Sequence, residues 1–471
     1  MKRNGLISLV LLAILCQLSF GQNARMNALG NPCLGVQGKN LIEDVSDVLY
    51  FPSEVATSTD MAQGVSSGYV YASKSIFKTL SIGFLFGKSS YTQASGLHTG
   101  LLNAYADVGA YVWQTGVPTG APVPVAGDFD LNAPTVPTNV GHFLIGLRLG
   151  NAIQIGADIF REASNSDIDS KIAATIAPGT PGAYIMTIES NGTSSYGTMG
   201  LNAGAALDVG LLKLKVATGL ILPSYSAEIT NKGNDTDPAG ATTYNIEISK
   251  MEATSAYYFP LTAKGTLKLE EHTITAGFDM VSSGCTFEAS FDDGDPGTTA
   301  EESYKSDEYS SIFFAFGVAD EIAVSPNTRF IPSLTLSRNS ESYKPQTVDS
   351  DNPEETYTTT TFPRATLAME HTVNDFWKFN KVVVRAGGSK SYYWQSQSLE
   401  GGITKVDFSD EPTYTAFSWY TGLGMTYGAL TLDLYMLPSE WNGIYLLSGE
   451  GPAGIGSGVT LTYKIGAGSA N

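Results

Sequence analysis

Charge, cysteine and long apolar runs are all scarce in this chain of 471 residues. Charged side chains make up 15% of it, against about 25% in a typical soluble domain. Three cysteines are too few for a disulfide framework. Beyond the N-terminus no run reaches about 18 apolar residues, which excludes a bundle of spanning helices. Basic residues number 27 against 46 acidic ones, so the chain does not have the basic surface of a nucleic-acid binder.

Glycine and aromatic residues are instead abundant. The chain has 50 glycines and 24 tyrosines, and aromatic residues reach 11%. A disordered chain would have fewer aromatics and more charge, and tyrosine favours strands. The composition therefore favours a large β protein.

The first 21 residues have the pattern of a secretory signal peptide. A short basic start is followed by an uncharged, mostly apolar stretch, and then by the small residues Ser19 and Gly21. Cys16 follows Leu15, where a lipidation signal would place a small residue. We therefore predict a signal peptide over 1–21 without lipidation. Processing would leave Cys33 and Cys285, either free or paired with each other.

Apolar and polar residues alternate through most of the remaining sequence. Ile153, Ile155 and Ile159, for example, alternate with Gly156 and Asp158. Such alternation predicts strands with one apolar face. The other face carries mainly glycine, serine, threonine and isolated charges. The links between strands alternate between short and long, and long links are predicted over 161–194 and 223–254 among others. A transmembrane barrel has these features.

The predicted fold is all-β, a transmembrane up-and-down antiparallel β-barrel of about 14–16 strands with a short N-terminal plug segment. Aromatic residues at both ends of the strand near 380–394 are typical of a membrane girdle. The predicted division is a plug or hatch over 22–60, a barrel over 61–466 and a tail over 467–471. Strands are predicted near 65–74, 79–88, 141–149, 153–161, 195–208, 211–222, 256–264, 271–282, 308–318, 328–339, 360–372, 380–394, 413–427, 429–438 and 457–466. One more is expected within 53–63, and 104–113, 183–189 and 243–249 also have an extended pattern.

The segment that follows the signal peptide does not alternate and carries a motif. Ala24-Arg25 and Leu29-Gly30 are followed by Asp44, Asp47 and Phe51-Pro52-Ser53. This resembles the N-terminal region of outer-membrane barrels related to long-chain fatty-acid transporters and PorV-type proteins, which have Asn-Pro-Ala after the aromatic residue. The resemblance implies that the segment folds inside the barrel as a plug, with Arg25, Asp44 and Asp47 as plug residues. A periplasmic tail is the alternative.

Isolated charges on the polar face are predicted to line the lumen, because a charge facing lipid would cost up to several kcal/mol. Such charges could line a wet pore, bind the plug or neutralise each other, and neutralising pairs are the favoured interpretation. The predicted lumen-lining residues are Arg148, Asp158, Lys213, Lys215, Asp279, Arg364, Glu370, Arg385, Asp433 and Lys464.

No motif indicates catalysis, a cofactor or a metal. The four histidines lie in separate segments, and G-x-S-x-G, H-E-x-x-H and C-x-x-C are all absent. Residues 292–295, Asp-Asp-Gly-Asp, are rich in oxygen ligands but lack the closing glutamate of an EF-hand loop. Solvated charge on long acidic loops is the favoured interpretation, and the chain is not predicted to be an enzyme.

The sequence therefore predicts a bacterial outer-membrane barrel for passive uptake of a small solute, hydrophobic solutes included, through a plugged lumen. Its expected partners are outer-membrane lipid, the solute and the outer-membrane assembly machinery, with no nucleic acid. Two alternatives remain open. One is a surface adhesin or a secretion or attachment scaffold that acts through the acidic loops, and the other is a soluble exported β-sandwich.

Overall fold

A computed structural model describes most of the chain. The described residues are 24–29, 32–34, 39–58, 60–65, 69–87, 140–176, 184–237, 240–292, 302–305, 308–344, 354–400, 414–436 and 458–465. The predicted signal peptide, the C-terminal tail, segment 104–113 and most of the acidic 292–295 motif lie outside these residues. Within the described residues, no helix is long and apolar enough to cross a membrane.

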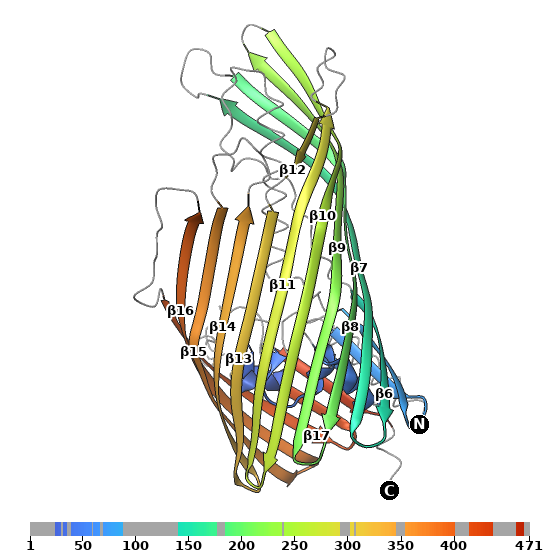
Figure 1. Ribbon diagram of the computed structural model, residues 1–471, viewed down its shortest axis with the longest axis vertical. Helices are drawn as coiled ribbons and strands as arrows, with labels where there is room; N and C mark the ends of the chain where they lie inside the picture. Colours follow the sequence, from blue (N-terminus) through green and yellow to red (C-terminus); the bar gives the residue numbers. More distant parts are fainter. Residues whose placement is uncertain are drawn as a thin grey trace.

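The strands form a closed antiparallel barrel in which neighbours in sequence are neighbours in space (Figure 1). Sixteen strand positions close the barrel, since the short β12 and the longer β13 both pair with β11. The predicted up-and-down barrel of about 14–16 strands is confirmed. The strands are β3 (Met61–Val65), β4 (Tyr69–Ser75), β5 (Leu80–Phe86), β6 (Val140–Leu149), β7 (Ile153–Ile176), β8 (Tyr184–Asp208), β9 (Leu212–Asp237), β10 (Gly240–Leu269), β11 (His272–Asp292), β12 (Glu302–Lys305), β13 (Glu308–Ser325), β14 (Thr328–Lys344), β15 (Glu354–Phe376), β16 (Phe379–Glu400), β17 (Tyr414–Tyr427), β18 (Leu430–Met436) and β19 (Gly458–Lys464).

The apolar face of the barrel wall is exposed on the outside, and the face with polar residues is buried inside. A soluble sheet has the opposite arrangement. On β7 the outward Ile155 and Ile159 are 44% and 50% exposed, whereas the inward Asp158 is 3% exposed. Large apolar side chains also point outward and are exposed on β6, β8, β9 and β13. A soluble β-sandwich packs its apolar faces against each other inside the molecule. The closed barrel with an exposed apolar outside therefore contradicts the sandwich alternative.

The strands β7–β11 continue far beyond the alternating pattern and form a tall wall on one side (Figure 1). The predicted long links over 161–194 and 223–254 were wrong, because most of these residues are strand. Segments 183–189 and 243–249 lie almost wholly in β8 and wholly in β10. The sequence of these extensions is mostly polar and lacks the apolar period of two on which the prediction depended.

Short turns connect the strands at the opposite end of the barrel. Gly150, Gly210 and Gly428 occupy three of these turns with φ values of 66°, 80° and 57°. Side chains rarely adopt this backbone region, and glycine enters it without a steric penalty. We call this end of the barrel the short-turn end.

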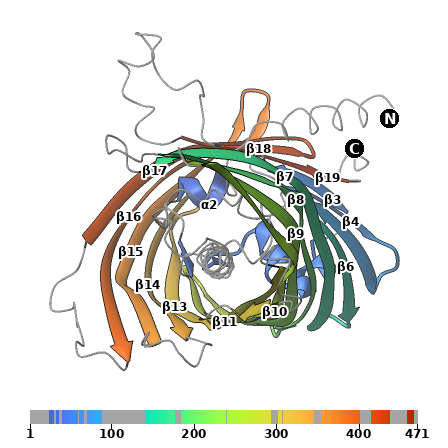
Figure 2. The same cartoon turned by 90° about the horizontal axis from the view of Figure 1, so that it is seen from above.

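The first described residues lie inside the barrel, in its lower part in Figure 1 and within the ring of strands in Figure 2. We call residues 24–58 the plug. Its elements are α2 (Ala24–Ala28), β1 (Cys33–Leu34), β2 (Lys39–Asn40), and the 3-10 helices η1 (Val45–Leu49) and η2 (Pro52–Ala56). A strand within 53–63 was therefore predicted wrongly in part, because 52–56 form η2 and the strand begins only at Met61.

Candidate functional site

The plug is tied to the lumen wall by two groups of charged side chains. The Arg25 cluster consists of Arg25 and Asp44 from the plug with Glu370, Arg385 and Asp433 from β15, β16 and β18. Arg25 donates to Glu370 over 3.1 Å and faces Asp44 at 3.5 Å. Arg385 donates to Glu370 over 3.0 Å and to Asp433 over 2.5 Å. One arginine of the plug is thereby joined to three strands of the wall.

The helix α2 also makes close contacts with the strands beside this cluster. The backbone N–H of Ala24 donates to the hydroxyl of Thr460 on β19 over 3.0 Å. A Cβ on Gly422 of β17 would lie 2.3 Å from the Cβ of Ala28. The helix therefore packs where a glycine leaves room for it.

The Asp47 cluster lies on the other side of the lumen. It consists of Glu43, Asp47 and Glu54 from the plug, which face Lys213 and Lys215 of β9 and Lys264 of β10. Asp47 accepts hydrogen bonds from Lys215 at 3.0 Å and Lys264 at 2.9 Å.

The two flanking glutamates complete the cluster. Glu54 lies 3.1 Å from both Lys213 and Lys215, and Glu43 lies 3.2 Å from Lys213. Three carboxylates thus meet three lysines, so the cluster carries no net charge.

Burial and the nearby lysines act in opposite directions on the plug carboxylates. Burial alone would raise the pKa of Asp47, but Lys264 and Lys215 hold this pKa below its ordinary value. The same balance lowers the pKa of Glu43, with Lys215 and Lys213 as the main cations. Both groups are ionised at neutral pH, which is the state that binds the lysines.

A third ionic contact joins β2 of the plug to the wall. The ammonium group of Lys39 donates to Asp279 on β11 and to the hydroxyl of Thr262 on β10, the latter over 2.7 Å. Lys39 and Asp279 are 2% and 0% exposed. A buried pair of this kind requires both partners, because either charge alone would be strongly unfavourable there.

A row of glycines in the wall makes room for η2. Gly146, Gly156 and Gly204 pair directly across β6, β7 and β8. A Cβ on Gly156 would lie 2.1 Å from the carbonyl oxygen of Pro52, and one on Gly146 would lie 2.7 Å from the backbone nitrogen of Ala56. We call this row the glycine cradle, and it brings the backbone of η2 against the backbone of the wall.

The remaining predicted lumen residues do not join the plug clusters. Asp158 accepts from His142 over 3.0 Å and from Asn202 over 3.4 Å, all within the wall. Arg364 lies 3.9 Å from the sulfur of Cys33. The Nε of Arg148 is buried and has no hydrogen-bond partner among the described residues. Lys464 is exposed at the short-turn end.

Above the plug, the inward face of the tall wall becomes apolar and aromatic. The residues that form this lining on β7, β8, β9, β10, β11 and β13 are buried and belong to one apolar cluster. They are Phe160, Tyr196, Ile221, Tyr225, Tyr258, Phe287, Tyr309 and Phe313. We call this set the aromatic lining. The rings of Tyr225 and Phe287 meet edge to face at 5.3 Å.

Sequence reasoning did not identify several of these residues as functional. Lys264 alternates with Thr262 and Thr266, so its parity could have placed it with the predicted lumen residues. Lys39, Glu43 and Glu54 lie in a segment without a period, where no such signal exists. Within the described residues, no group of three or more His, Cys, Asp or Glu side chains could hold a metal ion. Cys33 and Cys285 are both buried, and no disulfide joins them.

The comparisons with known proteins find similarity among solved structures. No family model matches the chain, and no curated protein sequence does. The toluene transporter TodX of Pseudomonas putida is 10% identical, with 89% of this chain and 93% of that chain covered, at a TM-score of 0.35. A FadL homologue of Pseudomonas aeruginosa is 9% identical, with 95% and 100% covered, at 0.30. The ferric yersiniabactin receptor FyuA of Yersinia pestis is 7% identical, with 86% and 79% covered, at 0.23.

By its name, the second of these belongs to the transporter family that the N-terminal motif resembles. At TM-scores of 0.35 and below, the matches carry no weight for the function of this chain. Its function is therefore argued from its own strands and side chains.

Proposed function

We propose that the protein is an outer-membrane β-barrel that takes up a small hydrophobic solute by passive diffusion through a plugged lumen. A signal peptide over 1–21 and insertion by the outer-membrane assembly machinery belong to the same proposal. The observation that carries it is the change in the lumen wall from paired charges around the plug to the aromatic lining above it.

The outer surface supports the membrane location. Large apolar side chains are exposed around the barrel, among them Leu201 at 54%, Phe316 at 51% and Leu367 at 54%. Exposed apolar area on this scale is unfavourable in water. A membrane barrel has an outward apolar band of this kind. Its wall is closed, so it has no exposed strand edges.

The inner surface supports a hydrophobic solute. Porins that pass ions and sugars have polar, water-filled interiors, whereas here Phe160, Tyr258 and Phe287 face inward at 1%, 0% and 0% exposure. Aromatic rings favour apolar solutes through burial and ring contacts. Below them, the neutralised Asp47 cluster gives a dissolved ion no net charge to bind.

Uptake of a hydrophobic dye into cells tests this proposal. N-phenyl-1-naphthylamine, which fluoresces in apolar surroundings, should enter cells that produce the protein several-fold faster than control cells. Maltose uptake should not change. The double variant Phe287→Gln and Phe313→Gln should slow the dye, because the lining becomes polar. Phe417→Gln, at an outward position that is 69% exposed, is the matched control. Equal dye uptake by all strains would contradict the proposal.

A second candidate function, a surface scaffold, is favoured by the tall wall. The strands β7–β10 contain 24, 25, 26 and 30 residues, whereas a tilted membrane crossing needs about 9–11. More than half of each strand therefore lies outside a bilayer. Removing residues 163–197 and 224–256, which shortens two hairpins, separates the two candidate functions. If the protein is a scaffold, the shortened chain loses surface attachment and dye uptake persists. If it is a transporter, dye uptake changes and surface attachment persists.

A further inference from the structure

A partly exposed carboxylate, Glu341, lies on the inner face of the barrel near the upper end of β14. It is three residues from Lys344, the last residue of that strand. In Figure 1, β14 ends well below the top of the tall wall, at the end of the barrel away from the short turns. The plug reaches β14 six residues earlier, where Leu41 and Thr335 both lie beside Gly317. Glu341 is therefore above the plug, at the mouth of the lumen.

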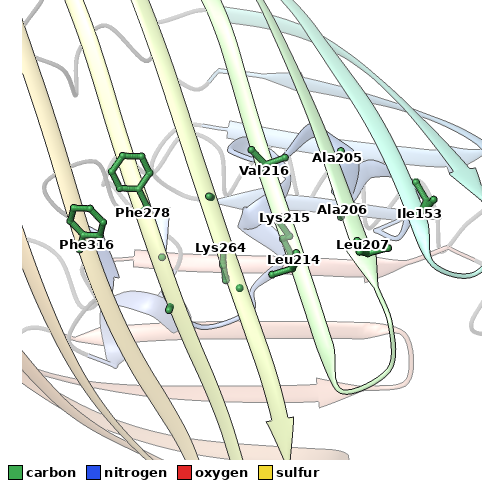
Figure 3. Close-up of a pocket in the computed structure, with 14 residues that line it drawn as sticks. Ile153, Ala205, Ala206, Leu207, Leu214, Lys215, Val216, Lys264, Phe278 and Phe316 are labelled. Atoms are coloured by element: carbon green, nitrogen blue, oxygen red, sulfur yellow. The ribbon is translucent and has the colours of Figure 1, made fainter.

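Glu341 faces no opposite charge among the described residues. Lys215 and Lys264 on β9 and β10 (Figure 3), by contrast, face Asp47 of the plug. Glu341 forms no ion pair with a described residue and accepts one hydrogen bond on Oε1, from the side-chain amide of Asn339 at 2.7 Å. Its second carboxylate oxygen, Oε2, is left to accept a hydrogen bond from a solute.

A row of polar side chains crosses three strands at this level. Ser283 on β11 is opposite Ser311 on β13, and Ser311 is opposite Glu341 on β14. Ser311 donates to the side-chain oxygen of Asn339 over 3.2 Å, and Asn339 in turn donates to Glu341. The hydroxyl of Ser283 is buried and has no hydrogen-bond partner among the described residues. Since buried polar groups are nearly always hydrogen-bonded, this row can make more polar contacts than the described wall supplies.

Two tyrosine rings border the same carboxylate. Tyr309 and Tyr343 lie opposite each other on β13 and β14, and their ring centres are 5.2 Å apart. They share the inner face with Ser311 and Glu341, because side chains two residues apart in a strand point the same way. Tyr309 belongs to the aromatic lining, and Tyr343 packs against the same apolar cluster. The face of an aromatic ring attracts a cation, so the rings and the carboxylate favour the same kind of group.

We propose that Glu341 and Tyr343 bind the ammonium group of a hydrophobic amine as this solute enters the lumen. The ammonium group donates to Oε2 of Glu341 and lies against the ring of Tyr343. The apolar body of the solute packs against Phe287 and Phe313 of the aromatic lining. A solute with a carboxylate group is disfavoured, because it would be repelled by Glu341. The inference rests on the proposed function, since it names the class of solute that the lumen admits.

Binding of three solutes with a common apolar body tests this proposal. Phenethylamine, phenethyl alcohol and hydrocinnamate carry an ammonium, a hydroxyl and a carboxylate group at neutral pH. Isothermal titration calorimetry compares them on the purified full chain in lipid nanodiscs, with empty nanodiscs as the blank. We expect the amine to bind about ten-fold more tightly than the alcohol, which is the effect of one charge-assisted hydrogen bond. Hydrocinnamate should bind most weakly.

A change at the carboxylate tests whether Glu341 is the source of this preference. Glu341→Gln should lower the affinity for the amine about ten-fold, to that of the alcohol, and should leave the affinity for the alcohol unchanged. Glu288→Gln is the matched control. That carboxylate lies on β11, is 50% exposed and pairs with Lys305 at 2.7 Å. Its replacement should leave binding of the amine unchanged.

The ring of Tyr343 is tested in the same way. Tyr343→Leu should weaken binding of the amine several-fold more than binding of the alcohol, because leucine offers no ring face to a cation. Tyr343→Phe keeps the ring and should keep the preference for the amine. Each variant is first checked for heat-modifiable migration. If a variant does not fold, the preference of the unaltered chain among the three solutes still tests the proposal.

Equal affinity for the amine and the alcohol, tightest binding of hydrocinnamate, or an unchanged affinity of Glu341→Gln for the amine would overturn the proposal. Its failure is distinguishable from failure of the proposed function. A chain that takes up the hydrophobic dye, but binds the three solutes alike or binds none of them, contradicts only the amine site. A chain that binds none of them and takes up no dye contradicts both.

Discussion

Asp47 accepts hydrogen bonds from two lysines of neighbouring strands, Lys215 and Lys264, and all three side chains are at most 2% exposed. Ionised groups in such a place are stabilised by their partners and strongly destabilised without them. The carboxylate is thus both a contact of the plug and the counter-charge that the two lysines need. Its removal affects the wall as well as the plug.

Replacing this carboxylate should loosen the plug. In Asp47→Asn, Lys215 and Lys264 lose their shared counter-charge, and breaking a buried pair costs about 3–5 kcal/mol. We expect the plug to become sensitive to protease in a barrel that still migrates as folded. Asp60→Asn is the control, because its partner Lys74 is 58% exposed and such pairs contribute at most about 1 kcal/mol. Equal protection of both variants would contradict this role.

A methyl group in the glycine cradle should displace η2. In Gly156→Ala, the Cβ would lie 2.1 Å from the carbonyl oxygen of Pro52, and overpacking of this kind costs about 1–3 kcal/mol. Gly141→Ala on β6 is the control, since its nearest contact would be 3.7 Å. Hydrogen exchange of 52–56 should rise in the first variant only, and unchanged exchange would show that the helix is not seated there.

At the level of single residues, parity in the sequence predicts that Lys213, Lys215 and Asp279 share a face with glycine, serine and threonine. It cannot show that their partners are Glu54, Asp47 and Lys39. Those partners come from a segment without a period, more than 150 residues away. The pairing depends on how the plug folds within the closed ring, which only the three-dimensional structure gives.

The plug as an element is attached by charge and should respond to pH in a defined direction. Asp47 and Glu43 have pKa values below their ordinary ones, which are about 3.9 for Asp and 4.3 for Glu. Groups with lowered folded pKa values stabilise the fold fully above the ordinary values and lose this contribution as pH falls through the lowered ones.

We therefore expect the plug to stay seated from neutral pH down to about pH 4 and to loosen below it. Protease accessibility of residues 24–58, measured in steps from pH 7 to pH 3, checks this. Loosening that begins near pH 6 would mean that a histidine, rather than the plug carboxylates, controls the contact.

The strands as elements were predictable within the apolar band and less so outside it. On β6 and β7, outward apolar residues such as Leu147 and Ile153 alternate with inward neighbours. This alternation predicts correctly which face of the wall each residue lies on. In the extensions of β7–β10 beyond the alternating segments, the pattern disappears because polar residues occupy most positions of the sequence. The strand conformation is maintained by backbone pairing, and β7 and β8 pair at 24 positions along the whole of β7. Backbone pairing does not require a pattern of apolar residues, so the sequence does not reveal it.

Considered as a whole, the molecule has three concentric layers. An outward apolar surface surrounds a closed wall, and the wall surrounds a plug held by two charged clusters and a glycine cradle. Above the plug, the aromatic lining replaces the charges. This order predicts a barrel that is closed to ions while the plug is seated.

Planar-bilayer conductance of the purified protein tests the plugged barrel most directly. We predict almost no ion conductance for the full chain, and stable, large channels for a chain that lacks residues 24–56 and for Asp47→Asn combined with Gly156→Ala. The point variants keep the test valid if the shortened chain does not fold. Large conductance of the full chain, or unchanged low conductance after the plug is loosened or removed, would contradict the account.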